Sequence, residues 1–416
     1  MKCYDVVISG AGPAGCSSAL FLARKGYSVL LLDMATFPRE KVCGDGITAA
    51  SSTLLEEMGV MDLVRLRLAP LMVFKGVTLF SPAGTVVQGR ISEAGSLAGA
   101  ACVIPRKELD ECLIACVKEH STITFLENTA VTDIIMDGDR ARGVRSSGGD
   151  WFGRVIIAAD GAYSPIASRL NLANKEKKHQ GFAIRAYFSN VEGLTDSIEL
   201  HYDKSMLPGY GWIFPSGKQR ANVGVGLMTR FKDQRGLKQL FERFVTENAF
   251  ASEKLKHAVM EPGTLKGWPL PFGSFQGKRG LGNILLTGDA GSFVDPLNGE
   301  GIYYALKSGR YAAEAASRVL DADETLASMH YEKLWRKEFS FHEFTLGYAL
   351  QPLLNNEFLL ESLIRFAAKK QTRANLLAGV IGHNFKKRDL LKLIPPFSRW
   401  SSRFAVLPSG KYCYLP

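Results

Sequence analysis

One segment, residues 5–33 with the sequence DVVISGAGPAGCSSALFLARKGYSVLLLD, constrains the fold more strongly than any other part of the chain. Its apolar run at residues 6–8 suits a buried parallel strand, and the run leads into a GxGxxG spacing at Gly10, Gly12 and Gly15. The tight turn needs one glycine, the approach of a phosphate to bare backbone needs another, and the third lets the following helix pack against the strand. The segment therefore predicts a βαβ unit with room for a phosphate.

The residues after the glycines complete this pattern. We expect a helix over residues 13–25, with Pro13 and Ala14 in its first turn, and then a strand that ends at Asp33. The helix N-terminus offers unpaired N–H groups and a partial positive charge, which suit a pyrophosphate. Asp33 stands 18 residues after Gly15, close to the ~20 expected of an acid that binds a ribose hydroxyl. These features predict a dinucleotide site; the alternative is a βαβ unit that serves the fold alone.

Composition limits the class of protein. The 416 residues, 46% hydrophobic and 22% charged, are typical of a globular chain of two or three domains. The chain shows neither an export signal nor an apolar run of about 18 residues that would predict a membrane span. Seven scattered cysteines favour reduced thiols, and their spacing predicts no metal site. We therefore expect a cytoplasmic protein.

The net charge of +10 is concentrated near the C-terminus. Residues 361–416 hold 11 Lys or Arg and two Asp or Glu, so the rest of the chain is nearly neutral. Basic and apolar residues interleave there, which suits either peripheral contact with the inner face of an anionic membrane or an ordinary solvated helical surface. No aromatic platform or helix-turn-helix pattern accompanies the charge, so we do not expect a nucleic-acid partner.

The loop after Asp33 carries polar groups beside the expected nucleotide. Lys41 adds a cation there, and Cys43 precedes Gly44 in surroundings where a thiol is rarely simple core. Cys43 can donate a proton, contact a substrate or shape the cofactor site; the alternative is a small residue needed for packing. Arg106, at the start of an expected amphipathic helix, can reach the cofactor's phosphates or flavin edge, or lie exposed.

Two later apolar strands also end in acids. Residues 155–159 lead into Asp160, and residues 284–287 lead into Asp289, which can hold a ribose or ribityl hydroxyl or cap a helix. A long helix is expected to open shortly after Asp289, with its N–H groups directed at the anionic edge of a reduced flavin. Its first residues are Gly299, Glu300, Gly301 and Ile302.

Residues 181–228 read as an antiparallel sheet that would form a wall facing the cofactor. Tyr210, Trp212 and Phe214 alternate along one of its strands, so the three rings share a side that is either a substrate pocket or ordinary core. From residue 326 onward the pattern is helical.

Taken in order, these motifs resemble a known class. GAGPAG at 10–15, Arg106 with Leu109-Asp110, Asp160-Gly161 and Gly288-Asp289 resemble the FAD-dependent oxidoreductases related to para-hydroxybenzoate hydroxylase. Within that class, the chain resembles the geranylgeranyl reductase family over about residues 1–320. The motifs that carry this closer resemblance are FPREKVCGDG at 37–46, GYGWIFP at 209–215, NVGVG at 222–226 and DPLNGEGI at 295–302.

The resemblance implies an α/β fold: a Rossmann-like FAD-binding domain with an antiparallel-sheet substrate domain and a helical C-terminal region. The expected FAD-binding domain is discontinuous (1–70, 98–172 and 277–345), the substrate domain comprises 71–97 and 173–276, and the basic helical region is 346–416.

The resemblance also implies roles for the motif residues. Cys43, Tyr210 and Trp212 become catalytic candidates. The expected FAD-binding residues are Gly10, Gly12, Pro13, Ala14, Gly15, Asp33, Lys41, Cys43, Gly44, Arg106, Asp160, Asp289, Gly299, Glu300, Gly301 and Ile302. One position departs from the family pattern, because Asp45 stands where many members have Gly, and an added carboxylate favours a more polar substrate.

Family members reduce isolated double bonds in prenyl chains of lipids, quinones or pigment precursors. Such a reduction needs a hydride and a proton delivered in a dry pocket. The electron donor would be NAD(P)H or another reductant that visits the flavin directly, because no second strand-linked GxGxxG follows.

Three other functions remain open. A flavin-dependent monooxygenase acting on an aromatic or polyketide-like molecule would use the same scaffold. A halogenase fits less well, because Tyr210 replaces the first Trp of WxWxIP. A non-catalytic membrane-bound scaffold is disfavoured by so complete a cofactor set.

Overall fold

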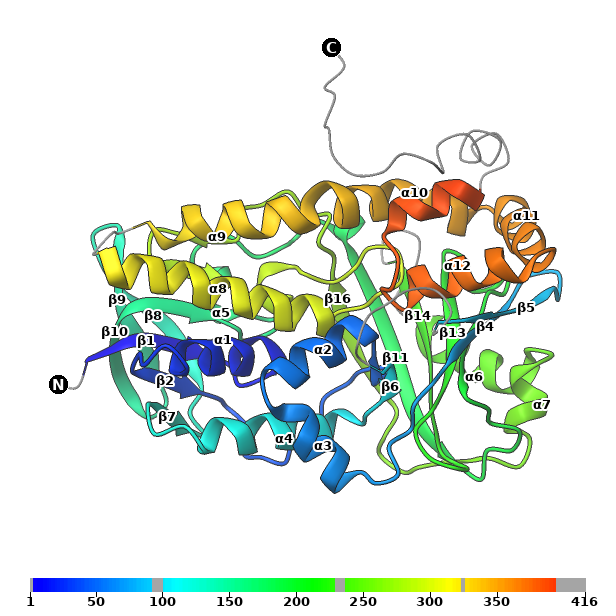
Figure 1. Cartoon of the computed structure of the whole chain (residues 1–416), viewed down its shortest axis with the longest axis horizontal. Helices are drawn as coiled ribbons and strands as arrows, with labels where there is room; N and C mark the ends of the chain where they lie inside the picture. Colours follow the sequence, from blue (N-terminus) through cyan, green and yellow to red (C-terminus); the bar gives the residue numbers. More distant parts are fainter. Residues whose placement is uncertain (1–2, 92–99, 229–235, 323–325, 394–416) are drawn as a thin grey trace, which may run out of the picture.

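The computed structural model describes residues 3–91, 100–228, 236–322 and 326–393. Two eight-stranded sheets stand next to each other in this part of the chain, with helices layered against both (Figure 1). A short third sheet pairs β3 (Gly46–Ile47) with β6 (Cys102–Val103). The mixed α/β architecture expected from the sequence is confirmed.

The first sheet is built on the predicted βαβ unit. Its strands run in the order β17-β18-β10-β1-β2-β7, and the neighbours from β18 to β7 are parallel. Antiparallel β8 and β9 extend it from β10. The bounds are β1 Cys3–Ser9, β2 Val29–Leu32, β7 Ile123–Leu126, β8 Val131–Asp137, β9 Arg140–Ser146, β10 Gly149–Ala158, β17 Gly280–Leu281 and β18 Ile284–Leu286.

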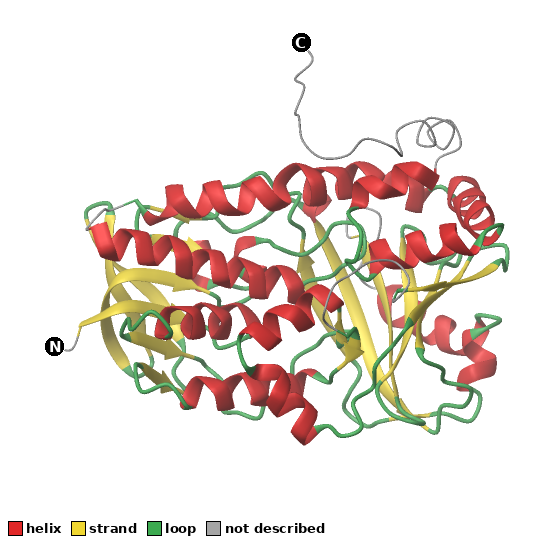
Figure 2. Ribbon diagram, viewed as in Figure 1, coloured by secondary structure: helices red, strands yellow, loops and turns green. Residues whose placement is uncertain are grey.

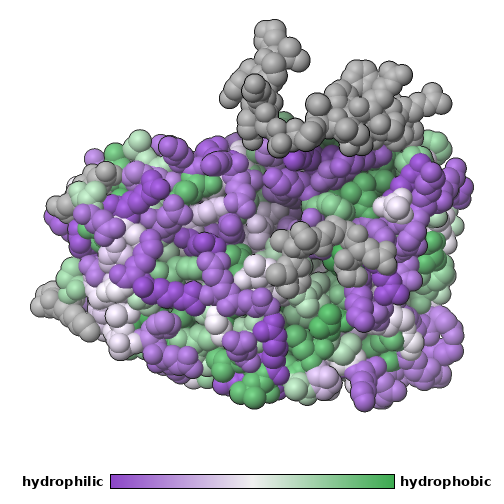
Figure 3. Space-filling model, viewed as in Figure 1, coloured by the Kyte–Doolittle hydropathy of each residue, from purple (hydrophilic) through white to green (hydrophobic). Residues whose placement is uncertain are grey.

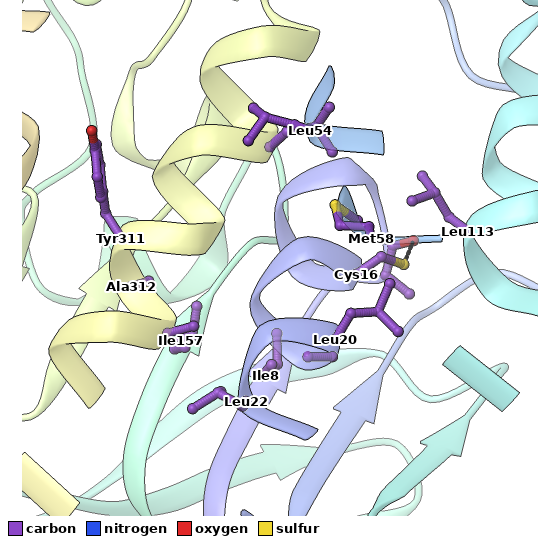
Figure 4. Packing of buried hydrophobic residues seen from close by; sticks show 14 of the residues in the cluster. Ile8, Cys16, Leu20, Leu22, Leu54, Met58, Leu113, Ile157, Tyr311 and Ala312 are labelled. Atoms are coloured by element: carbon purple, nitrogen blue, oxygen red, sulfur yellow. Dashed lines mark hydrogen bonds between the residues drawn. The ribbon is translucent and has the colours of Figure 1, made fainter. Parts of the chain in front are cut away.

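Helices bury one face of this sheet, as Figure 2 shows on its left half. Figure 4 shows Ile8 of β1 and Ile157 of β10 close to Leu20 and Leu22, which project from the first of these helices. Continuous apolar runs suit strands that are covered on both faces, and burying each such side chain stabilises the fold by about 1.5–3 kcal/mol. The covering helices are α1 Pro13–Ala23, α2 Ala49–Glu57, α3 Val60–Arg67, α4 Arg106–Lys118, α8 Ile302–Ala322 and α9 Ala327–Trp335; α5 Pro165–Arg169 packs on the opposite face.

The second sheet has the order β15-β11-β14-β13-β12-β4-β5, and β16 pairs with β11. It is antiparallel except for the β12–β4 pair, which is parallel and joins the β4–β5 hairpin, from an earlier part of the chain, to the sheet. The bounds are β4 Gly76–Phe80, β5 Val86–Arg90, β11 Gln180–Ser189, β12 Ser197–His201, β13 Gly209–Pro215, β14 Ala221–Met228, β15 Val259–Met260 and β16 Lys266–Pro271.

Helices cover both faces of the second sheet. The helices α6 (Leu237–Glu247) and α7 (Ala251–Leu255) cover one face, and neither was expected from the sequence. The C-terminal helices α10 (Leu346–Asn355), α11 (Glu357–Ala368) and α12 (Gln371–Ile381) cover the other face. A π-helical stretch, η5 (Arg336–Thr345), links α9 to α10. The helical character expected after residue 326 is therefore present. The domain boundaries stay a prediction, and residues 394–416 lie outside the described part of the chain.

Candidate active site

A cavity of about 1090 Å³ lies where the carboxyl ends of β1, β2, β10 and β18 meet the second sheet. This is the edge at which open parallel sheets bind ligands, and the volume is slightly above the usual range of about 300–1,000 Å³ for such pockets. Nearly all the predicted site residues line it: Gly10, Gly12, Pro13, Ala14, Asp33, Lys41, Cys43, Gly44, Arg106, Asp160, Tyr210, Trp212, Asp289, Gly299, Glu300, Gly301 and Ile302. Their individual roles stay predictions.

Gly15 stands behind the cavity wall and serves packing. A Cβ atom at Gly15 would lie 1.8 Å from the carbonyl oxygen of Gly10, so no side chain fits between α1 and the turn. Gly10 itself has a φ of +97°, and its Cβ would lie 2.3 Å from the carbonyl oxygen of Ala159. These glycines leave bare backbone at the N-terminus of α1, where N–H groups favour an anion.

Asp33 closes the same turn from the end of β2. Its Oδ2 accepts the N–H of Ala11 at 2.7 Å, and its Oδ1 accepts the N–H of Ala35 at 2.8 Å. The carboxylate therefore holds the glycine turn in shape from the edge of the cavity.

Asp160, Lys41, Asp289 and Trp268 line the part of the cavity next to the glycine turn. Burial raises the pKa of Asp160 to about 6, and its Oδ1 is buried without a hydrogen-bond partner. Burial lowers the pKa of Lys41 to about 8, against the opposing charge of Asp289, and its Nζ lies 3.1 Å from the centre of the Trp268 ring. A buried orphan oxygen of this kind indicates a place for a ligand donor.

Arg106 is buried, which excludes the exposed alternative. Its Nε and Nη2 donate to the two carboxylate oxygens of Asp110, each at 2.9 Å, and Arg39 reaches the same carboxylate at 3.2 Å. Burial opposes the charge, but the Asp110 carboxylate prevails and raises the pKa of Arg106. The result is a fixed cation beside the cavity.

Cys43 presents a protonated thiol. Burial raises its pKa to about 11, although the nearby Arg106 charge opposes the rise. Its Sγ accepts the N–H of Asp45 at 3.3 Å. A thiol with this pKa holds its proton at neutral pH, which suits proton donation better than nucleophilic attack.

Asp45 also lines the cavity, but its carboxylate oxygens bind other parts of the protein. Its side chain is 0% exposed and accepts three hydrogen bonds, from Tyr187, Asn222 and the backbone of Arg106. The more polar substrate expected from this carboxylate is therefore not indicated by the structure, because the charge is already satisfied inside the protein.

The three rings of β13 share one side, as the alternation predicted. Tyr210 and Trp212 lie 6.2 Å apart between ring centres, as do Trp212 and Phe214, and all three line the cavity. The Tyr210 hydroxyl donates to the carbonyl oxygen of Asn298, and the Trp212 indole N–H donates to Asn222 at 3.0 Å. The polar atoms are thus occupied, and the ring surfaces are what a ligand meets.

The loop before α8 supplies the remaining wall. Gly299 has a φ of +75°, and Glu300 accepts the N–H of Tyr303 at 2.8 Å through its Oε1. Burial raises the pKa of Glu300 to about 7. Beneath the loop, buried Lys387 forms ion pairs with Asp295 and Glu343.

Apolar side chains from both sheets and from the C-terminal helices continue the cavity beyond the aromatic face. They include Phe74, Ile198, Leu200, Leu227, Leu270, Leu297, Leu354 and Ile381. Among the described residues, no group of three or more His, Cys, Asp or Glu is arranged to hold a metal ion.

Several residues of this site were not expected from the sequence. Tyr187 and Arg185 lie on β11, and Lys387 was counted with a basic surface although it is buried. Asn222 could have been predicted, because it is the first residue of the NVGVG motif in an expected strand. A polar side chain buried in a strand needs a hydrogen-bond partner.

Comparison with known proteins gives consistent results. The family model described as "FAD binding domain" matches residues 3–333. The menaquinone reductase of Mycobacterium tuberculosis (strain ATCC 25618 / H37Rv) is 34% identical over 322 residues, which are 74% of this chain and 76% of the relative. The digeranylgeranylglycerophospholipid reductase of Methanocaldococcus jannaschii is 30% identical over 405 residues, 94% of each chain.

Solved structures share the fold. A geranylgeranyl bacteriochlorophyll reductase-like protein from Thermoplasma acidophilum has a TM-score of 0.81 at 21% identity, covering 95% of this chain and 99% of the other. The flavin-dependent brominase Bmp2 has a TM-score of 0.69 at 20% identity, covering 97% and 100%.

Proposed function

Because the chain belongs to the FAD binding domain family, and within it to the geranylgeranyl reductase-like FAD-dependent oxidoreductases, we propose that it reduces carbon–carbon double bonds of a prenyl chain. The prenyl chain would belong to a lipid, a quinone or a pigment precursor. The relatives named for menaquinone and for digeranylgeranylglycerophospholipid support this substrate class.

One observation carries the proposal: a single cavity joins the nucleotide turn to a long apolar wall. Gly10 and Asp33 line one part of it, Cys43 and Trp212 line the middle, and Leu354 of α10 lines another part. An unfunctionalised hydrocarbon chain is recognised by apolar surface rather than by hydrogen bonds, and walls of this kind also exclude water from the reacting atoms.

The residues present fit FAD. Gly10 and Gly15 leave bare backbone for the pyrophosphate, the orphan Oδ1 of Asp160 can accept from a hydroxyl or amine, and Arg106 offers a fixed cation. When bound, the flavin supplies the hydride that reduces one carbon of the double bond.

Cys43 supplies the proton for the other carbon in this proposal. Its thiol is protonated at neutral pH, and the thiolate left behind is stabilised by the Asp45 N–H and by the Arg106 charge. Tyr210 and Trp212 hold the substrate chain against the site through their rings. Water can then reprotonate the thiolate after the product leaves.

The reductant is proposed to be NAD(P)H or another donor that reaches the flavin through the open cavity. The sequence holds one strand-linked GxGxxG, which the FAD site uses.

Peripheral membrane contact is proposed for α11. None of the helices in the described part of the chain is long and apolar enough to cross a bilayer. Phe358 is 76% exposed at the start of α11, and Arg365, Lys369 and Lys370 are exposed at its end. On the face shown in Figure 3, hydrophobic residues gather mainly in the right half, which carries the second sheet and the helices α10, α11 and α12.

Sedimentation with vesicles tests this contact. We expect the chain to sediment with anionic phosphatidylglycerol vesicles and less with neutral ones, and Phe358→Ser to weaken the binding. If the parent protein and Phe358→Ser sediment equally with anionic and with neutral vesicles, the proposed membrane contact is contradicted.

Product mass tests the proposed reaction. The FAD-loaded chain, reduced with dithionite under anaerobic conditions, is incubated with menaquinone and with a digeranylgeranyl lipid. The products are then exposed to air, which oxidises any quinol ring back to the quinone, and their masses are measured. We expect the gain of two hydrogen atoms per reduced bond, with Cys43→Ser slower by at least about tenfold. A reaction that requires oxygen and adds an oxygen atom would identify a monooxygenase instead.

A further inference from the structure

We propose that Asp45 is a positioning residue whose carboxylate ties the Cys43 loop to both the second sheet and helix α4, and thereby holds the thiol beside the aromatic face. The inference rests on the proposed role of Cys43. It assigns a function to a side chain that lines the cavity but whose carboxylate oxygens bind protein groups, so that it acts through the Cys43 loop.

The backbone of Asp45 adopts a conformation that only contacts can maintain. Its φ is +66°, in the left-handed region, and its side chain is 0% exposed. Asp tolerates this region better than most residues, but the conformation still costs about 1–2 kcal/mol. A buried carboxylate adds a desolvation cost, so strong compensating interactions are required.

Three donors supply that compensation. Oδ1 accepts the N–H of Arg106 at 3.2 Å, the first N–H of α4, where the N-cap Pro105 offers no side-chain cap. Oδ2 accepts the Tyr187 hydroxyl and the Asn222 amide, the latter at 2.8 Å. The carboxylate thus caps a helix of the first half and binds two strands of the second sheet at once.

Asn222 extends the connection to the reacting region. The same Nδ2 that binds Asp45 also donates to the carbonyl oxygen of Cys43 at 2.8 Å, and Oδ1 of Asn222 accepts the Trp212 indole N–H at 3.0 Å. Together with the N–H of Asp45 on the Cys43 Sγ, these bonds fix the thiol relative to the Trp212 ring.

Cations stabilise the ionised form. Two guanidinium groups lie over the Tyr187 ring, that of Arg185 at 4.5 Å and that of Arg220 at 4.0 Å from the ring centre. Burial raises the pKa of Asp45, while the hydrogen bonds from Tyr187 and Asn222 and the Arg185 charge oppose the rise. Removing the carboxylate would leave buried donors on three elements unpaired, and the loop would lose its common anchor.

Asp45→Gly and Asp45→Asn test this assignment. Glycine accepts the positive φ without strain and removes the carboxylate, whereas asparagine keeps the shape and replaces one acceptor oxygen by a donor. Asp150→Asn, at the exposed start of β10, is the matched control. All variants carry Cys3→Ser, so that an exposed second thiol does not react.

Thiol alkylation of the FAD-loaded protein, followed at Cys43 by peptide mass, is the first readout. We expect alkylation at least about fivefold faster in both Asp45 variants, because the loop is released. We expect kcat to fall about tenfold or more while KM and FAD affinity stay within about threefold. Formate should restore part of the kcat of Asp45→Gly and none of that of Asp45→Asn, where the side chain fills the space.

Tyr187→Phe provides an independent check if an Asp45 variant fails to fold. It removes one bond to the carboxylate, so alkylation and kcat should change in the same direction by a smaller factor. Alkylation and kcat within twofold of the parent protein in Asp45→Gly, or no change in Tyr187→Phe, would overturn the assignment. If the parent protein reduces no prenyl substrate, the proposed function fails, and the alkylation rates alone still decide the role of Asp45.

Discussion

At the scale of single residues, Gly15 shows how one missing side chain sets the nucleotide turn. A Cβ there would lie 1.8 Å from the Gly10 carbonyl oxygen, whereas a Cβ at Gly26 would meet nothing within 4 Å. Gly26 has a φ of +84°, so its replacement costs backbone strain alone. Gly15 is therefore required because a side chain would clash, and Gly26 is required only because of its backbone conformation.

Gly15→Ala should accordingly lose FAD affinity by at least about tenfold and stability by about 2–3 kcal/mol, since α1 must move away from the turn. Gly26→Ala should cost about 1 kcal/mol and leave FAD affinity unchanged. Flavin fluorescence titration and urea unfolding measure both quantities. Equal FAD affinities of the two variants would contradict this prediction, because they would show that the glycine turn can shift without weakening FAD binding.

Glu300 makes a pH-dependent contribution in the FAD-free protein. Burial raises its pKa from 4.5 to about 7, so the folded form holds a proton that the unfolded form has released. The stability that this proton provides is fully present below pH 4.5 and is lost as the pH rises through about 7. Ionisation of Glu300 therefore destabilises the folded state at higher pH.

Glu300→Gln does not titrate, so it should become more stable relative to the parent protein between pH 5 and 8, by on the order of 2 kcal/mol. Urea unfolding of both proteins at the two pH values measures this gap. A gap that does not depend on pH would mean that Glu300 titrates at its ordinary value.

The spacing of residues in the sequence predicts the glycine turn of this site but not the contacts of Asp45. Gly10, Gly15 and Asp33 could be predicted because a βαβ turn places them within one continuous segment. The contacts of Asp45 with Tyr187 and Asn222 span 142 and 177 residues of sequence. No local period encodes such pairs, since they form only when the two sheets meet.

At the scale of elements, the C-terminal helices support the wall of the site. Lys387, in the segment after α12, is buried and forms ion pairs with Asp295 at the start of the cavity loop and with Glu343 of η5. Gln351 of α10 also donates to the carbonyl oxygen of Pro296, at 2.6 Å. The segment that matched no sequence motif thus anchors the loop that precedes α8.

Lys387→Met should destabilise the protein by about 3–5 kcal/mol and weaken FAD binding, because the buried Asp295 and the partly buried Glu343 lose their shared cation. Its neighbour Lys386 is exposed, so Lys386→Met should change stability by less than about 0.5 kcal/mol. Urea unfolding and FAD titration of both variants test the anchor. Similar effects of the two substitutions would refute it.

Element prediction succeeded where periodicity was strong. The helix expected over residues 13–25 is α1 (Pro13–Ala23), and the amphipathic helix expected to start at Arg106 is α4 (Arg106–Lys118). The missed helix α6 has buried apolar residues at 237, 240, 241 and 244, a helical spacing that was available in the sequence. The parallel pairing of β12 with β4 could not be predicted, because pairing between strands that are distant in the sequence produces no periodic pattern of residues.

At the scale of the whole molecule, function depends on the junction of the two sheets. The first sheet supplies the nucleotide turn, the second supplies the aromatic face, and the C-terminal helices extend the apolar wall (Figure 1). None of these parts alone forms a site that could hold both a flavin and a hydrocarbon chain. The account therefore depends on both ligands occupying one continuous cavity.

Reoxidation of the reduced flavin by a prenyl substrate tests this claim most directly. The FAD-loaded chain is reduced under anaerobic conditions, the excess reductant is removed, and the visible flavin absorbance is followed after mixing with menaquinone that carries its full prenyl chain or with a saturated-chain analogue. The account predicts reoxidation by the unsaturated chain, one flavin per double bond reduced, and none beyond reaction of the quinone ring with the saturated analogue. Identical flavin reoxidation by the two compounds, with the double bonds intact in the recovered product, would contradict it.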